Sequence, residues 1–209
     1  HLSATILIFC LGIVLLIVGG LPKRYIFGGI GVGVAGVATL ILSGAISYGS
    51  DRIKYWLDPW LDPSGEGFQT IQSLLAIGSG GILGRGIGMS RQKYLWVPEP
   101  HNDFIFSIIC EELGLVGAVV IILLFCLLVW RGFTIAMRSP DKFGSLLAIG
   151  LTFQVGLQAM LNIWVVTNTI PNTGISLPFF SYGGTSLLIL LAEMGVVLSV
   201  SRSANIEKV

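Results

Sequence analysis

The sequence is poor in charged side chains and in the residues that usually bind metals. Only 11% of its 209 residues are charged, two are histidines, three are cysteines, and the formal net charge is +1. A balance so near neutral provides no basic surface for nucleic acid and no polybasic anchor. Cys10, Cys110 and Cys126 lie within apolar runs and lack the paired spacing of a disulfide framework or a zinc site. We therefore interpret all three as packing residues of helices.

What the sequence has instead is apolar residues, at 54% of the chain and with a mean hydropathy of +0.87. These values lie outside the usual range of soluble domains and indicate a chain that has lipid as its solvent. A helix that spans the bilayer needs about 20 mostly apolar residues. The runs that meet this requirement are Leu2–Gly20, Tyr25–Ser43, Phe104–Trp130, Gly144–Thr167 and Thr185–Val200.

A further segment, Gln69–Gly88, is rich in glycine and carries Arg85. We expect it to form a short, broken or partly re-entrant helix that contacts protein rather than lipid. Counted as a crossing, it brings the total to about six spans, with both ends of the chain on one side. The sequence thus predicts an all-α, polytopic transmembrane helix bundle in which residues 1–209 form a single domain.

Positive charges beside the strongest spans indicate the orientation. The segment Arg131–Lys142 and the tail from Arg202 directly adjoin apolar runs, whereas residues 168–184 contain no Lys or Arg. Cytoplasmic loops are enriched in these two residue types. This places the C-terminus in the cytoplasm and puts segments 94–102 and 168–184 at the outer face, where we expect the chemistry.

Ionisable groups at membrane depth are costly and often functional. Asp103 lies at the start of the third apolar run, where a role as helix cap and a role in catalysis both remain open. Glu111 lies about 12 Å further along the helix axis and about 80° round from Asp103, whereas Glu112 lies about 180° round. Glu111 is thus the better candidate for a shared cavity, either as a structural partner of Arg85 or in substrate binding. Glu193, in the last run, is expected to make an interhelical hydrogen bond or ion pair.

Two polar patterns stand out in the last part of the chain. Gln154, Gln158 and Asn162 recur every fourth residue and form one stripe on a helix. Interhelical hydrogen bonding is the default interpretation of such a stripe, and a polar cavity wall is the alternative. The string SYGGTS precedes a helix, where exposed backbone amides can hold an anion such as pyrophosphate. Its candidate residues are Ser181, Tyr182, Gly183, Gly184 and Thr185.

Three longer strings resemble a known family: YLWVPEPHNDFIFSIICEELGLVG, NTIPNTGISLPFFSYGGTSLL and WLDPWLDPSGEGFQTIQSLLAIGSGGILGRGIG. Together they are similar, over essentially the whole chain, to the C-terminal half of the SEDS family (FtsW/RodA/SpoVE). HLSAT resembles the family's P-D-L-G-T motif, with His1 in place of the Asp. The resemblance implies the ten-span SEDS fold, of which this chain would hold about six spans and lack those at the N-terminus.

The resemblance also implies a function. It points to a peptidoglycan glycosyltransferase that polymerises lipid II with inversion at the outer face of the bacterial cytoplasmic membrane, together with a class B penicillin-binding protein. The family's H-T-D-F-I-F motif reads HNDFIF here, which makes Asp103 the implied catalytic residue. As a general base, its carboxylate would take the proton of the attacking sugar hydroxyl and contribute about 10² to 10⁴ in rate.

Other residues have supporting roles in this scheme. The departing undecaprenyl pyrophosphate needs positive charge, for which Arg85, Arg91 and Lys93 are candidates. Glu99 and His101 are expected to shape the sugar site. A divalent cation, Mg²⁺ or Mn²⁺, is compatible with the chemistry, although the sequence shows no metal-ligand spacing. Two alternatives stay open, a lipid II flippase and a non-catalytic scaffold that recruits the penicillin-binding protein.

Overall fold

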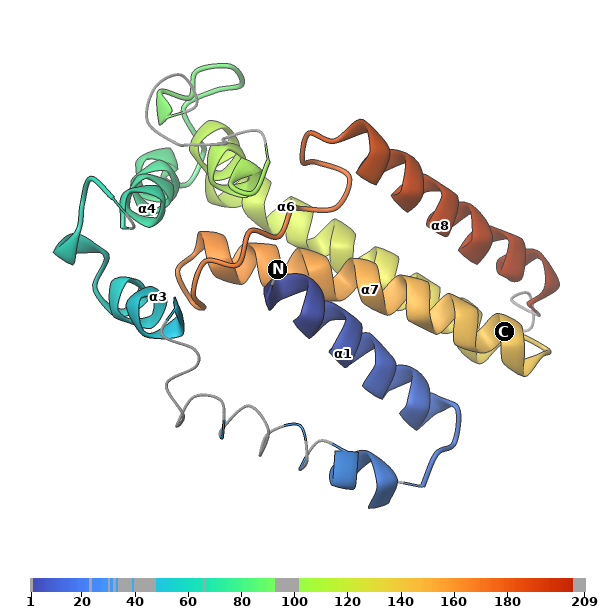
Figure 1. The fold of residues 1–209 in the computed structure, drawn as a ribbon. Helices are drawn as coiled ribbons and strands as arrows, with labels where there is room; N and C mark the ends of the chain where they lie inside the picture. The colour runs from blue at the N-terminus through green and yellow to red at the C-terminus, as the bar shows by residue number, and fades with distance from the viewer. Residues whose placement is uncertain are drawn as a thin grey trace.

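The computed structural model describes residues 2–22, 24–29, 31, 33, 39, 48–65, 67–92 and 102–204, and every regular element in these ranges is a helix. Four helices form the body of the molecule: α1 (Leu2–Val18), α6 (Ile105–Met137), α7 (Lys142–Val166) and α8 (Gly184–Ser203). They run side by side, with α7 packed against each of the other three (Figure 1). The expected all-α bundle is thereby confirmed.

Three of these helices, α6, α7 and α8, are long and apolar enough to cross a membrane. They correspond to the last three strong spans that the sequence predicts. Helix α1 matches the first predicted span but is shorter, at 17 residues. The second predicted span, Tyr25–Ser43, lies largely outside the residues that the structure describes.

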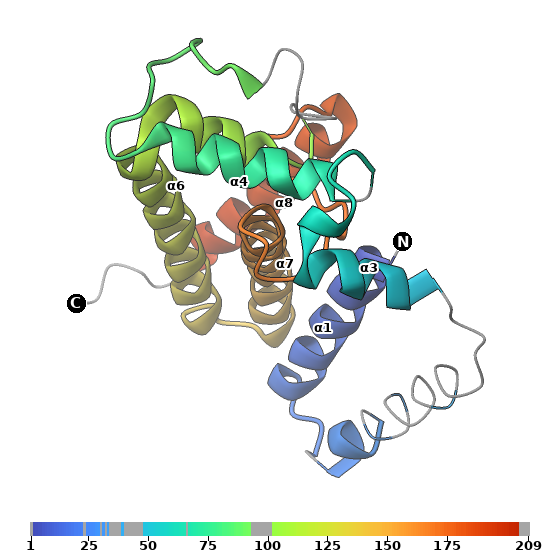
Figure 2. The ribbon, with the colours of Figure 1, turned by 90° about the vertical axis from the view of Figure 1, so that its left-hand side faces the viewer.

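Two short helices and a 3-10 turn lie together at one end of the bundle (Figure 1): α3 (Tyr48–Leu57), η1 (Pro59–Leu61) and α4 (Phe68–Gly80). Helix α4 has 13 residues, which is about 20 Å of rise against a hydrocarbon thickness of about 30 Å. It crosses the beginning of α6 at a steep angle (Figure 2). The segment Gln69–Gly88 is therefore the short helix that its sequence predicts, but counting it as a crossing was wrong.

This changes the predicted placement of the chain ends. The first half of α1 packs with the end of α7 through Leu7, Cys10 and Leu161, and its last residues line a cavity with the α6–α7 turn. Val200 of α8 packs beside that same turn, with Ala136. The start of α1 and the end of α8 therefore lie at opposite ends of the bundle, and not on one side as the six-span count required.

Helix α6 is interrupted at Gly114, where φ is 66° and ψ is −165°. Here four backbone hydrogen bonds of 2.9 to 3.2 Å join residues 111–116 to the loop 81–86 that follows α4. Backbone groups freed by a break inside a bilayer must find partners within the protein. The loop supplies them, so that α4 and α6 form one unit around the break.

The contact between α4 and α6 depends on Gly80. A Cβ added there would collide with the carbonyl of Cys110, whereas a Cβ at Gly78, in the same helix, meets nothing within 4 Å. We expect Gly80→Ala to lower the free energy of unfolding in detergent by about 1 to 3 kcal/mol, the usual cost of overpacking. Gly78→Ala is the matched control and is expected to unfold like the parent protein. Equal thermal stability of the two variants would contradict this close packing.

Candidate functional site

Asp103 lies one residue before the N-cap of α6, which is Phe104. It is therefore not the helix cap, one of the two roles that its position allowed. Its main chain is held by α7, because Asn162 Nδ2 donates to the Asp103 carbonyl at 2.7 Å and to the Ile175 carbonyl at 2.6 Å. Asn162 is completely buried. One side chain thus joins the start of α6 to the loop that connects α7 and α8.

That loop also approaches the Asp103 side chain, at Gly174. Gly174 has a φ of +65°, and a Cβ placed on it would lie 3.4 Å from Asp103 Oδ2, in van der Waals contact. The Ser181 hydroxyl donates to the Asn102 carbonyl and accepts from the Leu177 N–H, both at 2.7 Å. The prediction grouped Ser181 with an anion site, but its hydroxyl already serves to fix the loop beside Asp103.

The polar stripe on α7 makes interhelical and helix–loop hydrogen bonds, as its default interpretation predicted. Gln154 Nε2 donates to Glu193 Oε1 at 3.2 Å, which is the interhelical bond expected of Glu193. Gln158 Nε2 donates to the Ser176 carbonyl at 3.1 Å. With Asn162, the stripe holds α8 and the loop against α7.

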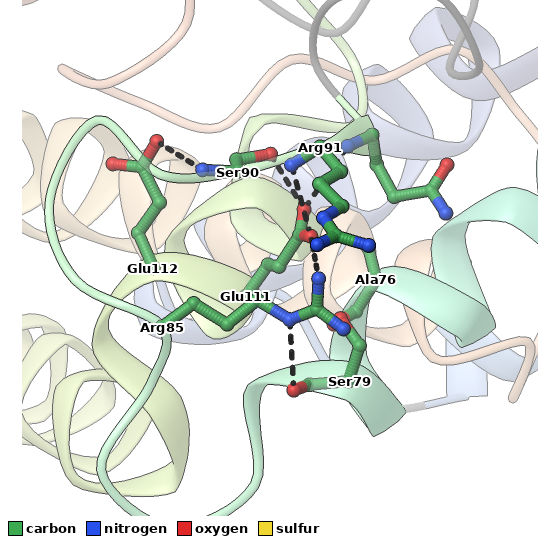
Figure 3. Close-up of polar contacts among 8 residues, drawn as sticks. Ala76, Ser79, Arg85, Ser90, Arg91, Glu111 and Glu112 are labelled. Carbon is green, nitrogen blue, oxygen red and sulfur yellow. Dashed lines mark hydrogen bonds and ion pairs between the residues drawn. The ribbon is translucent and has the colours of Figure 1, made fainter.

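A second polar cluster lies two turns into α6, around Glu111 (Figure 3). Its carboxylate is fully buried and accepts from the Ser90 hydroxyl at 2.5 Å and from the Arg91 N–H at 3.1 Å. Arg85 approaches the same carboxylate at 3.7 Å, and its Nε donates to the Ser79 carbonyl at 3.3 Å. The predicted pairing of Arg85 with Glu111 is present, and it anchors the segment after α4 onto α6.

Two guanidinium groups border one surface cavity beside this cluster. Arg85, Met89 and Arg91 line a cavity of about 430 Å³. Paired guanidinium groups suit a phosphate or pyrophosphate, because each offers several donors in a planar fork.

The remaining residues predicted to bind substrate lie either outside the described part of the chain or at the start of α8. Lys93, Glu99 and His101 lie outside the described residues. Tyr182 is 84% exposed, and Gly183, Gly184 and Thr185 form the start of α8, where no side chain caps the helix. Their role in binding an anion stays a prediction. Among the described residues no three His, Cys, Asp or Glu side chains gather into a metal site.

Sequence reasoning missed the link between Asn162 and Asp103. The stripe marked Asn162 as polar, but its acceptors are backbone carbonyls, which leave no trace in the sequence. Asn172 was also missed: it donates to Gln69 Oε1 at 3.0 Å and accepts from the Gly174 N–H at 3.2 Å. The only available signal was its place in a turn-rich loop.

The fold and this arrangement define a multi-pass membrane protein with an acidic residue held at one end of its helix bundle. Comparison with known families identifies the family within this class. The family model described as "Cell cycle protein" (FtsW/RodA/SpoVE) matches residues 1–206. The chain belongs to this family, which the SEDS resemblance had indicated.

Known relatives agree with the family model. The chain is 46% identical over 200 residues to "Stage V sporulation protein E" of Bacillus subtilis, covering 96% of the chain and 54% of that protein. It is 44% identical to the "Probable peptidoglycan glycosyltransferase FtsW" of Geobacter sp. strain M18, with the same coverage. The chain thus spans about half the length of the curated relatives that it matches.

One solved structure is similar in fold and sequence. It is described as "Structural coordination of polymerization and crosslinking by a peptidoglycan synthase complex". The TM-score is 0.71 at 35% identity, over 92% of this chain and 53% of the other. The similarity extends over nearly all of this chain.

Proposed function

We propose that the protein is an inverting peptidoglycan glycosyltransferase that joins lipid II disaccharide units, with Asp103 as general base. The observation that carries the proposal is the position of Asp103, held through its main chain by the buried Asn162 and lined on its side-chain side by Gly174. A base must be fixed within hydrogen-bonding reach of the proton that it takes. The names of the relatives support the same activity.

The reaction can be written with these residues. A hydroxyl oxygen of one sugar forms a bond to the anomeric carbon of a second sugar, and the bond from that carbon to the pyrophosphate oxygen breaks. The hydroxyl proton passes to the Asp103 carboxylate, and the electron pair of the broken bond stays on the pyrophosphate. The carbon is attacked from the face opposite to the leaving group, which gives inversion.

Negative charge develops on the leaving pyrophosphate, and Arg85 and Arg91 are the proposed partners of that charge. Their guanidinium groups border a cavity near Glu111, about 12 Å along α6 from Asp103. Fixed positive charge aimed at a developing anion is among the largest contributions to catalysis. A divalent cation as further cofactor is also a proposal, and because the described residues gather no three-ligand set, we assign no step to it.

The orientation and partner follow from the same proposal. Asp103 and the loop between α7 and α8 lie at the end of the bundle opposite to the end of α8, so a cytoplasmic C-terminus puts the site at the outer face. Arg202, in the last turn of α8, is the kind of residue enriched on the cytoplasmic side. A class B penicillin-binding protein is the proposed partner, since the related structure is of a peptidoglycan synthase complex.

Polymerisation of labelled lipid II by the purified full-length protein tests the proposal. We expect glycan chains that a gel resolves by length. The discontinuous α6 and the short α4 are also typical of transporters, so transport of lipid II in vesicles is the control measurement. Transport without any chain formation would replace the proposed activity with the flippase alternative.

Asn162 is expected to act as a positioning residue for Asp103. In Asn162→Ala the hold on the Asp103 carbonyl is lost, so kcat should fall about tenfold or more with KM for lipid II little changed. Gln158→Ala is the matched control, because it removes a hydrogen bond of the same stripe to Ser176 and none to Asp103. Asn162→Ala is expected to lose more stability, because Asn162 is completely buried, so kcat is compared at a temperature at which both variants are folded. An equal fall in kcat for the two would show a general structural effect instead.

A further inference from the structure

A second cavity lies at the end of the bundle that carries Asp103. It has a volume of about 600 Å³ and is enclosed by α3, the turn after η1, the start of α4 and the loop that follows α7. We call it the outer cavity. Ligand sites in proteins usually have volumes of about 300 to 1,000 Å³. The outer cavity is therefore large enough for one or two sugar rings.

The wall of the outer cavity combines aromatic rings with uncharged polar groups. Its main members are three aromatic and three carboxamide residues: Tyr55, Trp56, Phe68, Gln69, Asn168 and Asn172. Aromatic rings offer flat apolar surfaces, and carboxamides offer both donors and acceptors. A sugar ring has the complementary chemistry, since its faces carry C–H groups and its edge carries hydroxyls.

Charge separates this cavity from the one beside Arg85. None of the described residues that line the outer cavity is Lys or Arg, and the one acid among these described residues, Asp62, accepts from the Gly65 N–H at 3.0 Å. A pyrophosphate would need cationic donors, which border the other cavity. A polyprenyl chain would need a largely apolar wall. The outer cavity fits an uncharged part of the substrate instead.

Asn172 connects the outer cavity to Asp103. Its Nδ2 donates to Gln69 Oε1 at 3.0 Å within the cavity wall, and its Oδ1 accepts from the Gly174 N–H at 3.2 Å. Gly174 in turn lies against the Asp103 carboxylate. The same loop thus forms one wall of the cavity and one border of the catalytic group.

The cavity wall is fixed by contacts between distant parts of the chain. Trp56 Nε1 donates to the Asn168 carbonyl at 3.0 Å, and Asn168 Nδ2 donates back to the Trp56 carbonyl at 3.3 Å. The Ser73 hydroxyl, in α4, donates to the Val166 carbonyl at 2.8 Å. A site organised before binding loses less entropy when its ligand enters.

We propose that the outer cavity is a subsite for an uncharged amino-sugar ring of the glycan, next to the ring that reacts at Asp103. This inference rests on the proposed function. It divides the substrate by chemistry: a neutral sugar lies between aromatic and carboxamide groups, and the pyrophosphate lies between the guanidinium groups of Arg85 and Arg91.

A binding experiment without turnover tests the subsite. The probe is a β-1,4-linked tetramer of N-acetylglucosamine, titrated into the full-length protein in detergent and followed by ligand-observed NMR. We expect binding that inorganic pyrophosphate does not displace. Tyr55→Ala should raise the Kd by about tenfold or more, because it removes one aromatic face of the wall.

Three further variants complete the design. Trp60→Ala removes an aromatic side chain that is 65% exposed and lies outside the cavity, so binding should be unchanged. Ser64→Trp adds bulk at an exposed turn of the rim and should block binding even where Tyr55→Ala folds poorly. Asp103→Asn should bind the tetramer normally and yet polymerise about 10² to 10⁴-fold more slowly.

The outcomes are distinguishable. Equal binding by parent, Tyr55→Ala and Ser64→Trp, absence of binding to the parent, or displacement by pyrophosphate would each overturn the subsite. The subsite would also be overturned if the Ser64→Trp variant bound the tetramer but no longer assembled with a partner protein. If polymerisation depends on Asp103 while both cavity variants keep the parental KM, the subsite fails and the proposed function stands.

Discussion

Replacing Asp103 with Asn in the full-length protein is expected to lower the rate of lipid II polymerisation by about 10² to 10⁴-fold. A carboxamide has nearly the same shape as a carboxylate but cannot take up the proton of the sugar hydroxyl at neutral pH. The Asn162 bond to the Asp103 main-chain carbonyl is kept in this variant, and Asn preserves the shape of the side chain, so we expect the variant to fold. The measurement is the initial rate of glycan formation, with thermal unfolding recorded in parallel.

Asp58→Asn is the matched control for this variant. Asp58 is an exposed acid that caps η1 through the Trp60 N–H, and nothing in the proposed reaction involves it. Its variant should polymerise at the parental rate. If Asp103→Asn also polymerised at that rate, Asp103 would not be the general base, and the non-catalytic scaffold would become the better interpretation.

The apolar spans were the part of the fold that the sequence predicted well. The last three correspond to α6, α7 and α8, because a run of about 20 apolar residues has few alternatives to a spanning helix. Their ends were less accurate. The prediction ended the third span at Trp130, but α6 continues to Met137, since a helix does not have to stop where its apolar run meets arginine. Asp141 caps α7 through the Gly144 N–H, a signal that was present in the sequence and overlooked.

The break in α6 could not be predicted from local sequence. Gly114 lies in an apolar run with other glycines, where helix packing is the ordinary explanation. The non-helical backbone at this position is stabilised by the loop 81–86, which lies about 30 residues earlier in the chain and supplies the missing hydrogen bonds. A contact between residues so far apart in the chain leaves no periodic pattern in the sequence. Counting α4 as a crossing was an error for the same reason, because its position depends on this contact with α6.

The candidate site also has a part that the sequence predicts and a part that only the fold shows. Asp103 came from a resemblance to a family, and the pairing of Arg85 with Glu111 came from the cost of a buried charge. The groups that place these side chains are largely backbone atoms: the Asp103 and Ile175 carbonyls for Asn162, and the Arg91 N–H for Glu111. Backbone atoms are the same in every sequence, so only the fold shows which of them meet.

Removing the Glu111 carboxylate is expected to be the most destabilising single change in the described part of the chain. In Glu111→Ala the Ser90 hydroxyl and the Arg91 N–H lose their acceptor, and Arg85 loses its nearby charge. Each buried donor left without an acceptor costs about 1 to 3 kcal/mol, and the loss of the pairing with Arg85, whose side chain is 36% exposed, adds less. We therefore expect a large fall in thermal stability in detergent, or failure to recover folded protein.

Glu112→Ala is the matched control, because Glu112 is the neighbouring acid, is partly exposed and accepts from the Ser90 N–H at 3.4 Å. Its loss should cost less than about 1 kcal/mol. Glu111→Gln keeps the shape of the side chain and should fall between the two, since it retains an acceptor oxygen but not the charge near Arg85. The two roles that the sequence left open for Glu111 are separated by these variants. If Glu111→Ala unfolds like the parent and polymerisation alone is lost, Glu111 handles substrate, and the network seen around it is not what holds α4 to α6.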